Sequence, residues 1–386
     1  MKGHKIMIQF TINKNAFLSA MRIAKQAIGS KIAIPVLSKL KIQVTSEGIH
    51  FTASNGQISI EKLLPANDKD AGMLIDSEGA ILLEANFFDS IVAQLPDITF
   101  TFEEIENYQV KLSSGKSEIT LKGQQPELYP MIQQITAKPS TKIAVGELKE
   151  LFNETAFAVS TQESRPILTG VNIQLIDHQN LQAVATDSHR LSQRRIKLES
   201  FGEDFQVVVP NRAINSFRSV FSNDEDTISV FLNATQILFK NSTINFYSRL
   251  VEGNYPDTDR LIPDPSLYSL NLILDVADFL HAMNRAKLLT AGLQGGTVKL
   301  SVHDDKLMLT VNTPEVGSSF EELTMLEKSG QDIEISFNPQ FLIDALRVLK
   351  EPKVKISFIS NVRPFTLVPK DDSENFIQLI TPVRTN

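Results

Sequence analysis

The feature that most constrains the fold is a pattern that occurs three times along the chain. Its copies are "IPVLSKLKIQVTSEGIHFTASNGQIS" from Ile34, "RPILTGVNIQLIDHQNLQAVATDSHRLS" from Arg165 and "GGTVKLSVHDDKLMLTVNTPEVG" from Gly295. In each copy, two runs of alternating apolar and polar residues flank a short polar turn, which predicts a β-hairpin with one buried face. A repeat of this kind indicates one structural unit that is used several times. The chain is therefore expected to form three similar domains.

Segments of helical periodicity flank each hairpin. Those that precede it are "NKNAFLSAMRIAKQAI", "VGELKELFNETAFAVS" and "VADFLHAMNRAKLL", and those that follow are "EANFFDSIVAQLP", "VPNRAINSFRSVF" and "FNPQFLIDALRVLK". In the first, Phe17, Ala20, Met21, Ala24 and Ile28 form one apolar stripe. More strand-like runs complete each copy, so we predict an α+β fold with two helices packed on antiparallel sheet in each domain. The predicted domains are 1–138, 139–264 and 265–386, with residues 1–6 as an extension or tag.

Composition excludes several classes of site. The chain has no cysteine, which excludes disulfides and thiolate metal ligands. Its six histidines show no H-E-x-x-H spacing, so no metal and no cofactor are expected. "SSGKS" at 113–117 resembles the end of a phosphate-binding loop, but Val110 stands where the first glycine is needed. No apolar run approaches the roughly 20 residues that span a bilayer, and a cytoplasmic location is the expectation.

Charge is unevenly distributed along the sequence. The six helical segments (12–31, 84–96, 146–160, 210–221, 274–288 and 338–353) together carry +3, so the rest of the chain carries −10 of the total of −7. Proteins that grip nucleic acid over their whole surface are usually basic, because neutralised phosphates supply the affinity. Two interpretations of the helical cations remain open: a solvated helix face, or a surface that meets a polyanion loosely and without fixed register.

The stretch "ATDSHRL" places Asp187, Ser188, His189 and Arg190 in consecutive positions. These are the residue types of a hydrolase site, but four adjacent residues cannot converge as a nucleophile, base and orienting acid must. The stretch aligns with the end of the second hairpin strand in the other two copies, and only the middle copy carries His-Arg. A binding pocket is the favoured interpretation; a structural turn and a catalytic site are the alternatives.

These residues resemble a known family over nearly the whole chain. The sequence is similar to the bacterial DNA polymerase III β subunit, the replicative sliding clamp, and most of all to clamps of low-GC Gram-positive bacteria. "ATDSHRL", "EGNYPDTDRLIP" and "TPVRTN" are the most specific motifs. The resemblance implies three clamp domains per chain and a closed ring of two chains, in which helices line the hole and sheets form the outer wall.

The resemblance also implies a pocket that receives short peptides from partner proteins. In the family this pocket lies between the second and third domains. Ser188 replaces a glycine that is common in other members. Apolar walls would take apolar anchors, and arginines would frame the rim. The matching positions are Leu168, Thr186, Ser188, His189, Arg190, Leu191, Pro256, Arg260, Leu261, Pro364, Thr381, Pro382, Val383 and Arg384.

Two further surfaces follow from the resemblance. The joint between chains would use Lys116 and Ile119 on one side and Leu288 and Leu289 on the other, with Glu315, Glu321 and Glu322 in a complementary acidic loop. Glu118 stands where some relatives carry arginine, so ion pairs at this joint must differ. The surface that faces DNA would include Arg22, Lys25, Lys31, Gln162, Arg165, Arg212 and Arg218.

The predicted function is that of a processivity factor. A homodimeric ring would encircle duplex DNA without sequence preference and tether the replicative polymerase, thereby raising its effective local concentration. It would have no catalytic activity of its own. Expected partners are the polymerase alpha subunit, the clamp loader, and other polymerases and repair or ligase factors. Two rival hypotheses are a hydrolase that uses His189 with Asp187, and a repeat scaffold that binds peptides and never touches DNA.

Overall fold

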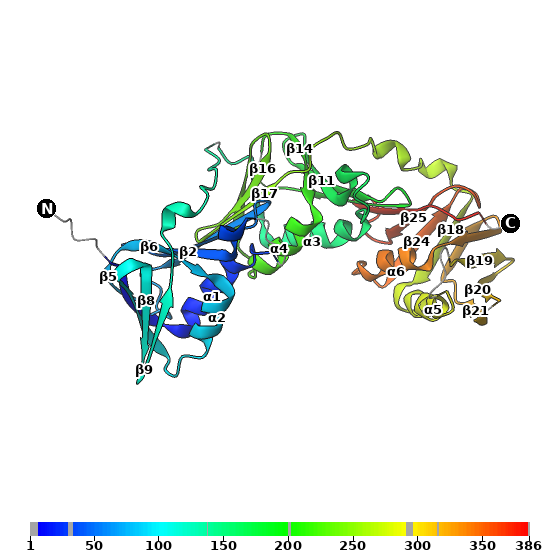
Figure 1. Ribbon diagram of the computed structural model, residues 1–386. Helices are drawn as coiled ribbons and strands as arrows, with labels where there is room; N and C mark the ends of the chain where they lie inside the picture. Colours follow the sequence, from blue (N-terminus) through cyan, green and yellow to red (C-terminus); the bar gives the residue numbers. More distant parts are fainter. Residues whose placement is uncertain are drawn as a thin grey trace. The chain divides into compact units, whose positions relative to one another are not determined.

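The computed structural model describes residues 7–29, 34–136, 138–199, 202–290, 296–314 and 316–384. Lys31 and Glu315, which the family resemblance assigned to the DNA-facing surface and the acidic loop, lie outside these residues. The chain divides into two compact units, Met1–Gly146 with Arg212–Leu250, and Glu147–Asn211 with Val251–Asn386. Each unit contains two antiparallel sheets with helices packed against them (Figure 1). Each unit therefore includes part of the middle repeat.

The first unit contains a five-stranded and an eight-stranded sheet. The five-stranded sheet has the order β5 (Leu74–Ser77), β1 (Gln9–Asn13), β7 (Thr99–Ile105), β8 (Gln109–Ser114) and β9 (Ser117–Lys122). The eight-stranded sheet has the order β10 (Thr141–Ala144), β15 (Thr227–Leu232), β16 (Gln236–Lys240), β17 (Ile244–Arg249), β4 (Ile58–Pro65), β3 (Gly48–Ser54), β2 (Lys39–Thr45) and β6 (Gly79–Glu84). Pairing of β17 with β4 joins strands of the first and second repeats into one sheet.

Helices α1 (Lys14–Lys25), α2 (Ala85–Ala93) and α4 (Asn211–Val220) pack on these sheets, with α1 and α2 side by side (Figure 1). The Asn13 side chain caps α1 by accepting hydrogen bonds from the backbone N–H groups of Asn15 and Ala16. Phe17 on the buried face of α1 contacts Phe51 of β3 and Phe100 of β7, with ring centroids 5.0 and 5.2 Å away. An aromatic core therefore holds this helix against both sheets.

The second unit contains a nine-stranded and a four-stranded sheet. The nine-stranded sheet has the order β14 (Phe205–Pro210), β11 (Gly170–Ile176), β12 (Asn180–Thr186), β13 (Arg190–Lys197), β26 (Phe376–Ile380), β25 (Phe365–Pro369), β24 (Lys353–Phe358), β18 (Leu270–Asp275) and β22 (Glu327–Gly330). The four-stranded sheet has the order β21 (Gly317–Leu323), β20 (Lys306–Thr313), β19 (Val298–His303) and β23 (Ile333–Phe337). Pairing of β13 with β26 joins the second and third repeats.

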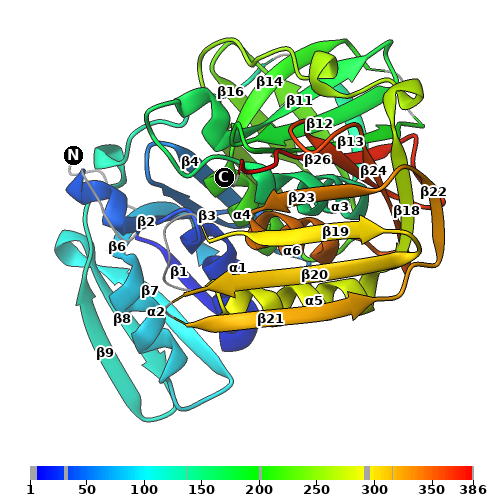
Figure 2. The same ribbon diagram turned by 90° about the vertical axis from the view of Figure 1, so that its right-hand side faces the viewer.

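Helices α3 (Val145–Thr155), α5 (Val276–Leu288) and α6 (Pro339–Arg347) belong largely to this unit. The side chain of Asp275 caps α5, and that of Asn338, which proline follows, caps α6. Figure 2 shows β20 and β21 of the four-stranded sheet passing over α5. Leu342 and Ile343 of α6 are fully buried in the same core as Ile356 and Leu367 of the large sheet. This core fixes the helix against the inner face of β24 and β25.

The structure confirms the predicted repeat. The three hairpins are β2–β3, β11–β12 and β19–β20, and the second strand of each ends at Ser54, Thr186 and Thr313. "SSGKS" forms the turn between β8 and β9, where Gly115 adopts a φ of +55°. A glycine in the left-handed region serves a tight turn, which accounts for this glycine without a phosphate ligand.

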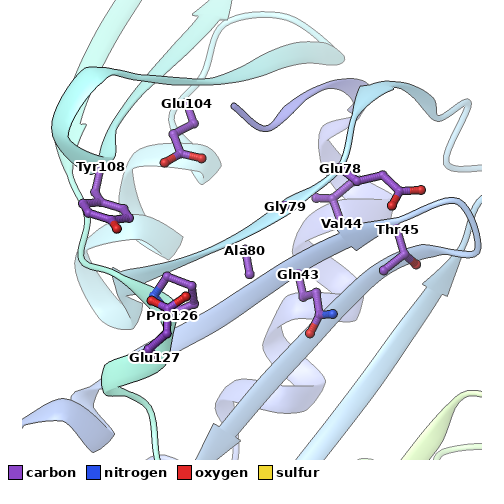
Figure 3. A pocket seen from close by; sticks show the side chains of 10 residues that line it. All are labelled: Gln43, Val44, Thr45, Glu78, Gly79, Ala80, Glu104, Tyr108, Pro126 and Glu127. Atoms are coloured by element: carbon purple, nitrogen blue, oxygen red, sulfur yellow. The ribbon is translucent and has the colours of Figure 1, made fainter. Parts of the chain in front are cut away.

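The first unit also contains a hollow of about 460 Å³ between β2 and β6 on one side and the end of β7 on the other (Figure 3). Its carboxylates are those of Glu78, Glu104 and Glu127. Glu104 is buried and lies 3.4 Å from the backbone N–H group of Ile8, which donates a hydrogen bond to it. Its carboxylate therefore helps to hold the first residues of the five-stranded sheet. None of the residues predicted for a functional site lines this hollow.

Candidate functional site

The candidate site is built around the turn that connects β12 to β13 in the second unit. The Asp187 carboxylate accepts hydrogen bonds from the backbone N–H groups of His189 and Arg190, at 2.9 and 3.0 Å from Oδ1. The Thr186 hydroxyl donates to the carbonyl of Arg190 at 2.6 Å and accepts from the N–H of Ser188 at 3.1 Å. Ser188 has a φ of +77°, in the left-handed region. The residue types of the motif are those that a tight turn requires, because short polar side chains satisfy its backbone groups.

Arg190 is the most enclosed charged group of the motif, with its side chain 13% exposed. Its Nε lies 3.0 Å from Asp187 Oδ2, and its Nη1 lies 2.7 Å from Asp344 Oδ2 of α6. Its guanidinium lies over the rings of Phe157 and Phe341, 5.5 and 4.9 Å from their centroids. Two carboxylates and two rings therefore fix this cation inside the protein. Instead of offering a free charge at a rim, Arg190 ties the turn to α6.

An apolar cluster lies beside the turn. Leu168 and Leu191, both predicted for the pocket, are buried in it together with Val184, Tyr255 and Leu379. Burial raises the pKa of the Tyr255 phenol well above its usual range. An apolar wall therefore lies beside the turn, and three of its strands are β12, β13 and β26.

The segment that follows Tyr255 carries more of the predicted residues. Leu261, at the end of the short helix η6 (Asp259–Leu261), is 52% exposed, although an apolar side chain gains free energy from burial. Pro256 is exposed, and Arg260, also exposed, pairs at 2.7 Å with the neighbouring Asp257. The residues that follow Tyr255 in the chain therefore present exposed apolar surface.

The C-terminal segment reaches the same turn. Thr381 donates two hydrogen bonds to the carbonyl of His189, from its N–H at 2.9 Å and from its hydroxyl at 2.8 Å. Val383 is 40% exposed, and its N–H bonds the carbonyl of Ser336 at 2.7 Å. Pro382 and Pro364 are half-buried, and Arg384 is exposed. The structure thus brings the C-terminal residues to the turn, 192 positions away in the sequence.

Sequence reasoning missed Phe157, Phe341 and Asp344. Phe341 also lies against the His189 ring, with centroids 6.3 Å apart and an interplanar angle of 14°. The two α6 residues are three positions apart, so they share one face of the helix. That spacing is visible in "FNPQFLIDALRVLK", but nothing in the sequence indicates that this face meets a turn in another repeat.

The geometry argues against the hydrolase hypothesis. Oδ1 of Asp187 accepts two backbone hydrogen bonds, and its Oδ2 pairs with Arg190. A base in a catalytic triad needs a carboxylate that orients its ring. The Asp187 carboxylate instead orients the turn and the arginine, while the His189 ring packs against Phe341.

Several predicted DNA-facing cations form contacts within the protein. Arg22 and Lys25 of α1 both pair with Asp89 of α2, at 2.8 Å for Arg22. Burial of Asp89 opposes ionisation, but the hydrogen bonds from these two cations prevail and lower its pKa. In α4, Arg218 lies 3.2 Å from Asn215 Oδ1, and burial lowers the pKa of this arginine. These cations therefore stabilise the helices as well as adding positive charge.

The remaining predicted DNA-facing residues are more open. Arg212 at the start of α4 is exposed. Arg165 and Gln162 are also exposed, and Nη1 of Arg165 lies 3.3 Å from the hydroxyl of Ser188. This hydrogen bond brings a predicted DNA-facing residue into contact with the turn at the candidate site.

Of the residues predicted for a joint between chains, Lys116 and Ile119 lie at one sheet edge, and Glu321 and Glu322 lie on a strand at another edge rather than in the predicted loop. β9, with Ile119 half-buried and Lys116 in the preceding turn, pairs only with β8 among the described strands. In the second unit, β21 is an edge strand that carries Glu321 and Glu322, and Glu321 pairs with Arg285. Glu118 lies 3.5 Å from Lys111 of its own sheet.

The apolar residues of the predicted joint differ in exposure. Leu288 at the end of α5 is 73% exposed, whereas Leu289 packs partly against the core. Phe320 on β21 is 71% exposed. An unpaired strand edge beside exposed apolar side chains can add a strand from another chain.

No group of three or more histidine, aspartate or glutamate side chains among the described residues is placed to hold a metal ion. No helix in the part of the chain that the structure describes has the length and apolar character needed to cross a membrane.

Comparison with known proteins identifies the class of fold. Models of the DNA polymerase III beta subunit match residues 8–133 for its N-terminal domain, 142–257 for its central domain and 260–384 for its C-terminal domain. The chain is 57% identical over 380 residues to the beta sliding clamp of Lactococcus lactis subsp. lactis (strain IL1403), covering 98% of this chain and 100% of the relative.

Solved structures agree with these matches. A crystal structure of the DNA polymerase III beta chain from Streptococcus pneumoniae TIGR4 gives a TM-score of 0.95 at 54% identity. A crystal structure of the DNA polymerase sliding clamp from Bacillus subtilis gives 0.94 at 36% identity, and both alignments cover 98% of this chain and 100% of the other. The chain therefore belongs to the DNA polymerase III beta subunit family, the beta sliding clamps, which are non-catalytic processivity factors of DNA replication.

Proposed function

We propose that two copies of this chain close into a ring around duplex DNA. In this ring, the β9 edge of one chain meets the β21 edge of the other, with Lys116 and Ile119 facing Leu288 and Leu289. Two different edges on each chain can form a closed ring if the contact repeats through a twofold rotation. The unpaired edges and the exposed Leu288 support this arrangement.

We propose that enclosure, rather than tight binding, keeps the protein on DNA. The chain as a whole carries −7, which disfavours a surface that grips phosphate strongly. Enclosure removes the need for such a surface, because a closed ring stays on DNA without high affinity. Weak cationic contacts would come from the helices and the Gln162–Arg165 loop, and Lys31 is assigned to the same surface.

The second part of the proposal is a peptide-binding site at the β12–β13 turn. Leu168 and Leu191 supply a buried apolar wall. Exposed apolar side chains come from Leu261, in the segment that follows Tyr255 of this wall, and from Val383, in the segment that follows Thr381 at the turn. A partner's apolar side chains would gain free energy by covering this surface. The occupants would be short segments of the polymerase alpha subunit, the clamp loader, and other polymerases and repair or ligase factors. We further propose a cytoplasmic location and domain bounds of 1–138, 139–264 and 265–386.

The full-length match to clamps, with a TM-score of 0.95, carries the ring proposal. It is tested by light scattering and by retention on DNA. We expect a mass near twice the 43.0 kDa chain, retention on nicked circular DNA, and release when that DNA is linearised. Ile119→Asp should shift the mass toward one chain, whereas Ile98→Asp, at an exposed position of the first unit outside the predicted joint, should not. A wild-type monomer, or equal retention on circular and linear DNA, would refute the ring.

The peptide site is tested separately. Leu261→Asp should weaken binding of a labelled clamp-binding peptide of the polymerase about 30-fold, as loss of a central apolar contact does. Leu267→Asp is the matched control, because Leu267 lies in the same segment and is 56% exposed. Equal peptide affinity in the two variants would place the peptide elsewhere. Light scattering of both variants separates this result from any change in assembly.

A further inference from the structure

A second groove in the second unit lies on the outer face of the nine-stranded sheet. Its floor comes from β13, β26, β25 and β24, which are neighbours in that order. The paired residues Gln193 and Ile377 form one part of the floor, and the pair Lys355 and Val368 forms another. Residues paired across strands share a face of the sheet, so these side chains form one surface.

This surface is opposite the one that carries α6. Gln378, the neighbour of Ile377, donates a hydrogen bond to the carbonyl of Ala345 in α6 at 3.0 Å. Ile356, the neighbour of Lys355, is buried in the core with α5 and α6. Because successive side chains in a strand point to opposite faces, Ile377 and Lys355 point away from the helices.

The segment after η6 forms a wall of the groove. Ile262, Pro263 and Tyr268 line it, and the Thr366 hydroxyl on the floor donates a hydrogen bond to the Tyr268 hydroxyl at 3.0 Å. The groove has a volume of about 590 Å³, within the range of roughly 300 to 1,000 Å³ that small-molecule sites occupy. Leu261, which we assign to the peptide site, precedes Ile262 and does not line this groove.

The charges in the groove indicate what it would bind. Arg195 and Asp259 pair with each other at 3.3 Å. Lys355 makes no ion pair among the described residues, and it is half-buried on the floor. Glu374 also lines the groove but is exposed to water, which weakens its field. The charge that a ligand could complement is therefore the Lys355 cation, in a groove that Ile262, Val368 and Ile377 also line.

We propose that this groove binds a small molecule with an apolar, ring-sized body and a carboxylate group. The body packs between Ile262, Val368 and Ile377, and the carboxylate pairs with the ammonium group of Lys355. The floor spans β13 and β26, so a bound molecule braces the pairing that joins the second and third repeats. Any ligand that binds only the folded state also stabilises that state.

The probe is 4-phenylbutanoate, titrated into the full chain and followed by saturation-transfer NMR, with 4-phenylbutanamide as its uncharged counterpart. Lys355→Met should weaken binding of the acid about fivefold, the loss of one charged contact at a partly exposed site. Lys353→Met is the matched control, because Lys353 lies two residues away on the same face of β24 but outside the groove. Glu374→Gln should tighten binding about twofold by removing a repelling charge.

Two further comparisons make the result decisive. The amide should bind about fivefold more weakly than the acid to the wild type and equally to Lys355→Met. Leu261→Asp should leave binding of the acid unchanged, which distinguishes this groove from the peptide site. No binding to the wild type, equal binding by the two lysine variants, or loss of binding in Leu261→Asp alone would overturn the proposal. Thermal midpoints of the variants show whether each has folded.

Discussion

Two arginines on β13, Arg190 and Arg194, each lie between two carboxylates and near an aromatic ring. They differ in how completely hydrogen bonds replace the water that these charged groups have lost. Arg190 lies between Asp187 and Asp344 and over the ring of Phe341. The two carboxylates have further partners: Asp187 accepts two backbone hydrogen bonds, and Asp344 accepts one from Gln340 at 2.6 Å. Each charge at this position therefore has a hydrogen-bonded counterpart.

Arg194 has the same kind of neighbours but a poorer arrangement. It lies between Glu154 of α3 and Asp372, with its guanidinium 5.8 Å from the centroid of the Phe376 ring. Its Nε and Glu154 Oε2 are 3.0 Å apart, within ion-pair distance, but neither atom has hydrogen-bond geometry toward a partner among the described residues.

The pKa of the Glu154 carboxyl reflects this poorer arrangement. Burial raises its pKa to about 7; Arg194 and Lys350 oppose that rise, while Glu150 and Asp372 add to it. The comparison teaches that an ion pair in a protein interior stabilises the fold only when hydrogen bonds replace the lost water. Arg190 meets that condition more fully than Arg194 does.

The largest expected effect is that of Arg194→Met. Removal of the cation leaves the buried Glu154 carboxylate without its nearest compensating charge, which costs about 3 to 4 kcal/mol of unfolding free energy at pH 8. At pH 5 the Glu154 carboxyl is protonated, and the loss should shrink. Urea unfolding at the two pH values measures both quantities. Arg363→Met, at an exposed position, is the control and should change stability by less than about 0.5 kcal/mol. An equal loss at both pH values would contradict the role assigned to Glu154.

Arg190→Met should have a smaller effect. Asp187 and Asp344 are 16% and 21% exposed and retain hydrogen bonds from other groups, so we expect a loss of about 2 kcal/mol, with little difference between pH 5 and pH 8. The same urea titrations measure it. A loss that exceeds that of Arg194→Met would reverse the comparison between the two arginines.

The sequence predicts this region only in part. The alternation of apolar residues predicted the hairpins, and their alignment placed Asp187 at the end of a strand. It could not predict that Asp344 would reach Arg190, because the two are 154 positions apart and no periodicity reports contacts between repeats. The helical cations illustrate the same limit: a count of charges indicated a basic layer, whereas Arg22 in fact pairs with Asp89.

The pH dependence of the unfolding free energy should report the ionisation of the Glu154 carboxyl. Its pKa is raised in the folded state, from an ordinary value of 4.5 to about 7. The stabilisation that the protonated Glu154 carboxyl gives the folded state is therefore complete below about pH 4.5 and is lost as the pH rises through 7. We expect the unfolding free energy to fall by about 2 kcal/mol between pH 5 and pH 8 from this group. Glu154→Gln, which cannot ionise, should remove that part of the slope.

A slope that Glu154→Gln leaves unchanged would show that other groups titrate in this window. Glu252→Gln is the matched control, because Glu252 is an exposed carboxylate in the same unit. It should leave the slope between pH 6 and pH 8 unchanged.

The smallest expected effect compares the turn with its counterpart in the first repeat. Ser188 and Gly56 occupy equivalent positions, with φ of +77° and +85°. The N–H of each bonds the hydroxyl two residues earlier at 3.1 Å, from Thr186 in one turn and Ser54 in the other. The first and second repeats therefore share a left-handed turn, although the residue in it differs.

A left-handed conformation costs a side chain about 1 kcal/mol that glycine does not incur. Ser188→Gly removes this cost and should stabilise the fold. The gain should be only about 0.5 kcal/mol, because glycine loses more entropy on folding and the hydrogen bond from Arg165 is lost. Gly56→Ser should destabilise it by about 1 kcal/mol, since open space around Gly56 leaves only the backbone strain. Thermal unfolding of the two variants measures both signs. If both substitutions destabilise the protein, the Ser188 hydroxyl contributes more to the site than its turn geometry requires.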